Sequence, residues 1–112
     1  MEPRLASSVL VSALLRRAEA EGGFGMVLAR GDATAGSIAV VLVERGASPR
    51  LFERMLAPDS RYVWSESPQR PEDESALKAL LERRRQIDPD LWIVELDIAS
   101  SERFAAEMNA LG

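Results

Sequence analysis

The 112-residue chain contains no cysteine and no histidine. This excludes disulfides, cysteine-ligated zinc, cysteine nucleophiles and Ser-His triads. Acid–base chemistry would fall to carboxylates, to the single tyrosine Tyr62 or to the single lysine Lys78. Any metal would be a hard cation held by oxygen atoms, and no motif predicts a cofactor.

The chain also lacks an excess of positive charge and a long apolar run. The net charge is −4, which argues against a dedicated nucleic-acid binder. No stretch reaches the roughly eighteen apolar residues of a membrane span. The apolar stretch from Leu5 to Leu15 is followed directly by Arg16, Arg17 and Glu19, unlike a signal peptide. We therefore expect a cytoplasmic protein that folds as a single domain over residues 1–112.

Hydrophobic periodicity predicts an α+β fold with the order αββββαβα. We expect a mostly antiparallel sheet of four to five strands, with two to three helices packed on one face. The predicted helices cover residues 8–21, 71–87 and 101–111. The predicted strands cover residues 24–30, 37–45, 51–56, 61–66 and 91–98.

Two strands carry stronger signals than the others. Ile38 to Val43 is apolar on both faces, which is typical of a central strand. Short glycine-containing loops on either side of that strand predict antiparallel hairpins with both neighbours. In the last strand, Trp92 and every second residue after it form one apolar face. The opposite face begins apolar and ends with Glu95 and Asp97, which indicates that it leaves the core or reaches a sheet edge.

Four carboxylates near that strand form the best candidate cluster. Asp88 and Asp90 flank a proline, and Glu95 and Asp97 share a strand face. Either pair could hold a divalent cation. The favoured interpretations are turn chemistry for the first pair and a solvated or interface-facing strand end for the second.

Arginine supplies all but one of the 14 basic residues. Arg83, Arg84 and Arg85 lie in the last turn of a predicted helix, where cations complement the helix dipole. A phosphate-binding patch would require them to converge in space with Arg16 and Arg17.

Aromatic residues offer one candidate contact surface. Tyr62 and Trp64 lie on a predicted strand that also carries charged residues, which is typical of a sheet edge. An exposed edge of that kind suits a protein partner or a second copy of the chain. Trp92, by contrast, is expected in the core.

The element order also resembles that of restriction-endonuclease-like nucleases. Asp32 and Glu44 are the nearest match to their acidic residues. The lysine of the nuclease signature is replaced by Gly46, so the catalytic signature is missing.

Three segments resemble a family of short bacterial proteins that is known as domain of unknown function 1491. They are Val11 to Arg17, Gly31-Asp32 through Gly36, and Asp88-Pro89-Asp90-Leu91-Trp92-Ile93-Val94-Glu95. The resemblance covers Leu5 to Asp97, while the tail from Ile98 and the length of Pro49 to Arg70 depart from it. It implies a stand-alone cytoplasmic protein and assigns no catalytic residue.

The leading hypothesis is a non-enzymatic protein-interaction or small binding module, with a homodimer as one form. One alternative is a metal-dependent hydrolase or degenerate nuclease that uses Asp32, Glu44, Glu95 or Asp97. Another is a weak nucleic-acid binder that uses the arginine clusters. The candidate interaction surface consists of Arg83, Arg84, Arg85, Asp88, Asp90, Glu95, Asp97, Tyr62 and Trp64.

Overall fold

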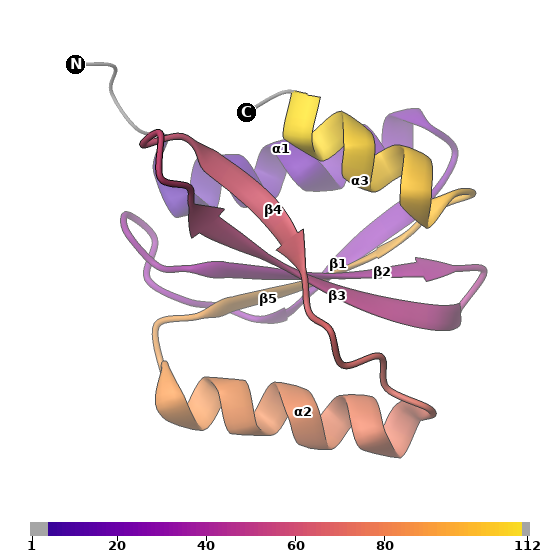
Figure 1. Cartoon of the computed structure of the whole chain (residues 1–112). Helices are drawn as coiled ribbons and strands as arrows, with labels where there is room; N and C mark the ends of the chain where they lie inside the picture. Colours follow the sequence, from indigo (N-terminus) through magenta and orange to yellow (C-terminus); the bar gives the residue numbers. More distant parts are fainter. Residues whose placement is uncertain (1–4, 111–112) are drawn as a thin grey trace.

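The computed structural model describes residues 5–110, which form three helices and five strands (Figure 1). Their order is αββββαβα, as the sequence predicted. The predicted last helical residue, Leu111, lies outside the described residues. The elements are α1 (Ser7–Ala20), β1 (Phe24–Ala29), β2 (Ile38–Glu44), β3 (Ala47–Leu56), β4 (Tyr62–Glu66), α2 (Glu74–Ile87), β5 (Trp92–Asp97) and α3 (Ser101–Ala110).

The strands form one mixed sheet in the order β1-β5-β2-β3-β4. β2 and β5 are parallel, and the other neighbouring pairs are antiparallel, so the predicted α+β class is confirmed. The predicted hairpin of β2 and β3 is also confirmed. Its turn places Arg45 and Gly46 in the left-handed region, with φ values of 53° and 76°. The predicted hairpin of β1 and β2 is wrong, because β5 lies between them.

Residues 30–37, which we call the crossing loop, join β1 to β2 past the start of β5. Strands that flank a third strand lie about 10 Å apart, and the crossing loop is long enough to span that distance. β1 and β2 still run in opposite directions, as a short connection requires. The length of this loop therefore does not show whether β1 and β2 are hydrogen-bonded neighbours or have a third strand between them.

The helices cover both faces of the sheet. α1 and α3 pack on one face and α2 packs on the other (Figure 1). The prediction that all helices share one face is therefore wrong. The physical reason lies in β2, whose residues from Ile38 to Val43 are buried on both faces. A strand that is apolar on both sides needs cover on both sides.

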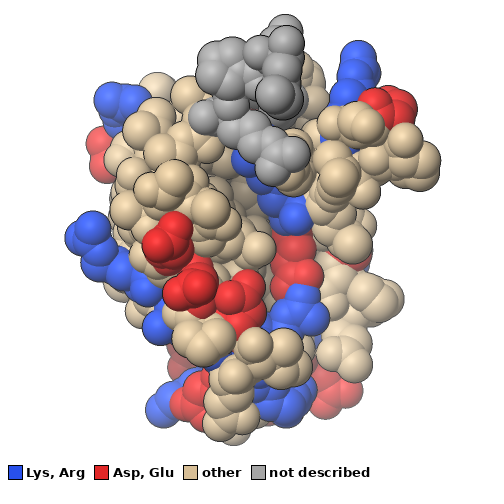
Figure 2. Space-filling model, turned by 90° about the vertical axis from the view of Figure 1, so that its left-hand side faces the viewer, with Lys and Arg blue, Asp and Glu red and all other residues tan. Residues whose placement is uncertain are grey.

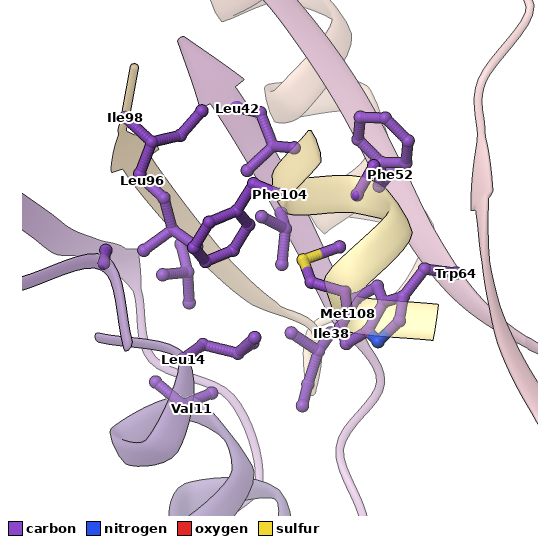
Figure 3. Close-up of a cluster of buried hydrophobic side chains, with 14 of the residues drawn as sticks. Val11, Leu14, Ile38, Leu42, Phe52, Trp64, Leu96, Ile98, Phe104 and Met108 are labelled. Atoms are coloured by element: carbon purple, nitrogen blue, oxygen red, sulfur yellow. The ribbon is translucent and has the colours of Figure 1, made fainter. Parts of the chain in front are cut away.

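The larger core lies between the sheet and the helices α1 and α3. Figure 3 shows side chains from both helices pointing toward those of the central strands. Burying one large apolar side chain contributes about 1.5–3 kcal/mol relative to exposure, so this cluster dominates the folding free energy. Its labelled members are Val11, Leu14, Ile38, Leu42, Phe52, Trp64, Leu96, Ile98, Phe104 and Met108.

The smaller core lies under α2. Leu80 is buried, and Leu77 and Leu81 pack partly buried against the apolar residues of β2, β3 and β5. The helix begins at Glu74 rather than at the predicted Pro71. Asp73 is its N-cap, and the Asp73 side chain accepts a hydrogen bond from the Ala76 amide at 2.8 Å.

The crossing loop is bound to the start of β5 by three hydrogen bonds. The Asp32 amide donates to the carbonyl oxygen of Asp90 at 3.0 Å, and the Trp92 amide donates to that of Ser37 at 2.8 Å. The Trp92 indole Nε1 donates to the carbonyl oxygen of Asp32 at 2.7 Å. These bonds satisfy the amide and the indole N–H of buried Trp92 and fix β5 between β1 and β2.

The crossing loop also holds the beginning of α1. The helix N-cap is Ala6, which has no side-chain oxygen to accept from the first amides. Instead, the amides of Ser7 and Ser8 donate to the carbonyl oxygens of Thr34 and Ala33, at 3.2 and 3.0 Å. One loop thus supplies partners to a helix and a strand that are far apart in the sequence.

Two positions in the crossing loop have no room for a side chain. A Cβ atom on Gly31 or on Gly36 would overlap the carbonyl oxygen of Asp90. That oxygen cannot move away without breaking its hydrogen bond to the Asp32 amide. The close approach of two backbones therefore requires glycine at both positions.

We predict that Gly31→Ala lowers the free energy of unfolding by about 3 kcal/mol, because the new methyl group must displace the Asp90 main chain. Urea unfolding followed by tryptophan fluorescence measures the loss. Gly46→Ala is the matched control: nothing lies within 4 Å of its Cβ position, and only the positive φ opposes the substitution. The control is expected to lose about 1 kcal/mol. Equal losses in the two variants would contradict the packing argument.

Candidate functional site

The arginines at the end of α2 are largely used by the fold. Arg84 forms an ion pair with Glu53 of β3. The Arg85 guanidinium donates from Nη1 to the carbonyl oxygen of Leu91 at 2.6 Å. Arg83 is exposed and forms no ion pair within residues 5–110. Arg84 and Arg85 thus join α2 to the sheet, and of the three arginines only Arg83 has no hydrogen bond or ion pair within residues 5–110, which is too little for a phosphate-binding patch.

Asp88 and Asp90 form the turn that ends α2. The Asp88 Oδ1 atom accepts from the Asp90 amide at 3.1 Å, and the Asp88 carbonyl oxygen accepts from the Leu91 amide at 3.1 Å. The Asp90 carbonyl oxygen is the acceptor for the crossing loop. Both residues therefore have the turn role that the sequence favoured.

Glu95 and Asp97 lie at the other end of β5, and their surroundings differ. The Asp97 Oδ1 atom accepts from the Arg45 amide at 2.8 Å and so stabilises the hairpin of β2 and β3. Glu95 is half-buried, lies beside Met26 of β1 and Val41 of β2, and forms no hydrogen bond or ion pair with residues 5–110. β5 is a central strand, so the predicted sheet edge at Glu95 is not found. Of the two predicted outcomes, the strand face leaving the core is the observed one.

The carboxylates do not gather into a metal site. Asp32 lies before β2 and Glu44 at its end, and a seven-residue strand separates them by about 20 Å. Within residues 5–110 no group of three or more acidic side chains is placed to hold a metal ion. The Glu44 Oε2 atom accepts from the Ser101 amide at 2.7 Å and caps α3. This geometry gives no support to a hydrolase or nuclease centre formed by Asp32 and Glu44 together.

β4 lies at an edge of the sheet, as its charged residues predicted, but Trp64 is covered there. Trp64 is only 7% exposed and belongs to the larger core, while the Arg54 guanidinium lies 4.4 Å from the centre of the Tyr62 ring. The outer side of β4 is capped by Asn109 of α3. Its side chain accepts from the Trp64 amide at 2.7 Å and donates to the Trp64 carbonyl at 3.2 Å. The prediction of an exposed Trp64 is therefore wrong, because α3 covers it.

β1 forms the opposite edge of the sheet, and this edge is open. Phe24, Met26 and Leu28 are 58%, 49% and 43% exposed. β1 pairs only with β5, and no hydrogen bond joins its outer side to another segment within residues 5–110. An edge strand normally carries charge, proline or a covering element on such a side. β1 has no charged residue and no proline between Phe24 and Ala29, and its one irregularity is a register shift against β5 between Val27 and Ala29, at the end of the strand.

The position of α2 explains why β1 is uncovered. Phe24 lies opposite Asp97 in the register, and Met26 lies opposite Glu95, so these side chains share the α2 face of the sheet. The core under α2 is formed by β2, β3, β5 and α2, with Ala29 at its margin. Glu95 and Asp97 lie where the apolar residues under α2 end on that face. They are acidic in an otherwise apolar strand because α2 does not cover them.

Sequence reasoning missed the β1 edge. The signal was present, since Phe-Gly-Met-Val-Leu-Ala alternates large and small apolar residues without one polar side chain. Such a run is also typical of a strand buried on both faces. Only the sheet order shows that β1 lies at an edge.

The end of the molecule at which β2 begins carries two shallow hollows of about 350 and 380 Å³. They share Ser37, Ile38 and Arg54 in their linings. Figure 2 views this end and shows acidic and basic side chains interleaved over it. Neither charge sign dominates the face, so it is a poor match for a polyanion.

Comparisons with known proteins agree with this fold. The family model described as "Protein of unknown function (DUF1491)" matches residues 5–106. It extends past Asp97, so the expectation that the tail from Ile98 departs from the family is wrong. A crystal structure of a DUF1491 family protein from Caulobacter crescentus CB15 is 38% identical, with a TM-score of 0.80, and the match covers 90% of this chain and 94% of that one.

Two further solved structures are similar. An NMR structure of a DUF1491 family protein from C. crescentus CB15 is 37% identical, with a TM-score of 0.78, covering 93% of this chain and 94% of that one. The solution structure of protein Atu0922 from A. tumefaciens is 32% identical, with a TM-score of 0.75, covering 92% and 93%. No curated protein matches the chain.

Acidic side chains that hold the fold predict a loss of stability in acid. The guanidinium of Arg50 donates two hydrogen bonds to Glu66, at 2.9 and 2.7 Å, and lowers the pKa of the Glu66 carboxyl. The Ser101 amide likewise lowers the pKa of Glu44. A carboxyl whose pKa is lower in the folded state stabilises the protein above the unfolded value of 4.5, and that contribution is lost as the pH falls through the folded value.

We therefore predict that the free energy of unfolding falls as the pH is lowered below about 4.5. Glu66→Gln should cost about 1 kcal/mol at neutral pH and flatten this acid dependence. Glu82→Gln, at an exposed position of α2, is the control and should leave the dependence unchanged. Urea unfolding over a pH series measures both. Identical acid dependence in wild type and Glu66→Gln would show that the ion pair does not contribute.

Proposed function

We propose that this chain, which belongs to the DUF1491 family of proteins of unknown function, is a non-enzymatic protein-interaction module. It binds an extended segment of a protein partner along the outer side of β1. The observation that carries this proposal is the combination, on one strand, of an unpaired backbone edge and exposed Phe24, Met26 and Leu28.

Strand addition uses both of these features. Main-chain hydrogen bonds to an added strand supply affinity, and alternate side chains supply specificity. Phe24 and Met26 project from one face of the sheet, and Glu95 beside Met26 has a carboxylate without a partner in residues 5–110. A bound strand that carries an apolar side chain and a basic side chain would complement this surface.

The contrast between the two sheet edges supports a binding role for β1. At β4, Asn109 satisfies the amide and the carbonyl of Trp64 in the middle of the strand, where a partner strand would have to pair. At β1 no such cover is found in residues 5–110. Open apolar edges invite aggregation, so a fold that closes one edge and keeps the other has a use for the open one.

A non-catalytic role also agrees with the chemistry that the chain provides. It has neither cysteine nor histidine, and Asp32, Glu44 and Asp97 accept hydrogen bonds from backbone amides. No helix within residues 5–110 is long and apolar enough to cross a membrane. We propose that the module works in the bacterial cytoplasm. A chain without cysteine forms no disulfide and therefore needs no oxidising compartment to fold.

Selection from a phage-displayed library of random peptides tests the proposed function. We expect enrichment of peptides with alternating apolar residues. Met26→Lys should weaken their binding at least about tenfold, because it puts a charge on the docking face. Met55→Lys is the matched control: Met55 lies on β3, on the same face of the sheet, and is 54% exposed against 49% for Met26. Failure to enrich any peptide, or equal binding to both variants, would contradict the proposal.

A further inference from the structure

We infer that the partner strand at β1 is supplied by a second copy of this chain. Two molecules pair their β1 strands antiparallel about a two-fold axis and form one continuous ten-stranded sheet. This inference rests on the proposed function, since it uses the same edge, and it adds the identity of the partner and the geometry of the contact.

The number of open edges favours a closed dimer. Within residues 5–110 each molecule offers β1 as an open edge, while Asn109 caps β4. Pairing of β1 with β1 consumes the open edge of both copies. The same patch then faces itself across the axis, which is the arrangement of an isologous dimer, and the remaining edge of each copy is β4, where Asn109 caps Trp64.

The apolar side chains of β1 are arranged to match their own copy. With the axis near Met26, antiparallel pairing places the Met26 side chains of the two copies together. Phe24 of each copy then comes toward the end of the partner's β1, where the register with β5 shifts between Val27 and Ala29. Phe24 and Met26 of each molecule share one face and would form an apolar patch across the axis.

Charge near the two ends of β1 agrees with the antiparallel direction. Before the strand, Arg17 and Arg103 are paired with Glu21 and Glu107, which leaves the charge of Glu19. Glu19 precedes the strand, is exposed and forms no ion pair within residues 5–110. Arg30 follows the strand, is exposed, and its guanidinium lies 5.6 Å from the centre of the Trp92 ring. Antiparallel pairing brings the basic end of each copy to the acidic end of the other. Parallel pairing would bring like charges together.

The contact involves one short strand from each copy, so the dimer is expected to be weak. Interfaces of this size lie at the low end of specific contacts. Sedimentation velocity over about 1 μM to about 1 mM covers the corresponding range of dissociation constants. We expect a reversible monomer–dimer equilibrium. Met26→Lys should raise the dissociation constant at least about tenfold, and Met55→Lys should leave it unchanged.

The absence of cysteine allows a direct geometric test. Met26→Cys introduces the sole thiol of the chain at the proposed axis, and Met55→Cys introduces one on a strand away from it. Side chains directly opposite across paired strands have Cβ atoms about 5 Å apart, close enough for a disulfide after small adjustments. Under mild oxidation Met26→Cys should yield covalent dimer much faster than Met55→Cys.

Three results would overturn the inference. They are a monomer over the whole concentration range, a dimer that is unaffected by Met26→Lys, and equal cross-linking of the Met26→Cys and Met55→Cys variants. These outcomes are separate from failure of the proposed function. If the protein is monomeric but enriched peptides still lose binding in Met26→Lys, β1 is a docking edge for another protein. If both experiments fail, the edge is not a binding surface.

Discussion

The hydrogen bond from the Asp32 amide to the carbonyl oxygen of Asp90 holds the crossing loop against the start of β5. Next to it, the Trp92 indole donates to the carbonyl oxygen of Asp32. The first amides of α1 donate to other carbonyl oxygens of the crossing loop. β5 is the last strand of the chain, yet it lies in the middle of the sheet. This contact fixes it there, and both cores are built on β5.

This constraint changes the meaning of the most family-specific residues. The Gly31-Asp32 to Gly36 segment and the Asp-Pro-Asp-Leu-Trp block resemble separate motifs in the sequence, but in space they are two sides of one backbone contact. The carboxylates of Asp32 and Asp88 accept amide hydrogen bonds, and Gly31 and Gly36 allow two segments of the backbone to touch. The residue types that suggested chemistry hold the fold together. The surfaces that remain open are the candidates for function, and the β1 edge is the most distinct of them.

Periodicity predicted all eight elements, the central position of β2 and the end of α2 at Asp88, because each depends on residues close in the sequence. It did not predict that β5 separates β1 from β2, since that depends on contacts between residues 32 and 90. Burial of Trp64 was missed for the same reason, because α3 covers it from far along the chain. The candidate site was the least predictable part. Arg83, Asp88 and Glu95 could be singled out from the sequence, but the β1 edge could not, because its position depends on pairing between distant strands.

Native-state hydrogen exchange, resolved by residue, tests most directly whether the crossing loop organises the fold. The account predicts that the amides of Asp32 and Trp92 exchange only through global unfolding, with a free energy within about 1 kcal/mol of that from urea denaturation. Exchange of these two amides through local opening, several kcal/mol below the global value, would contradict it. The loop would then be a peripheral connection, and β5 would be held by the cores alone.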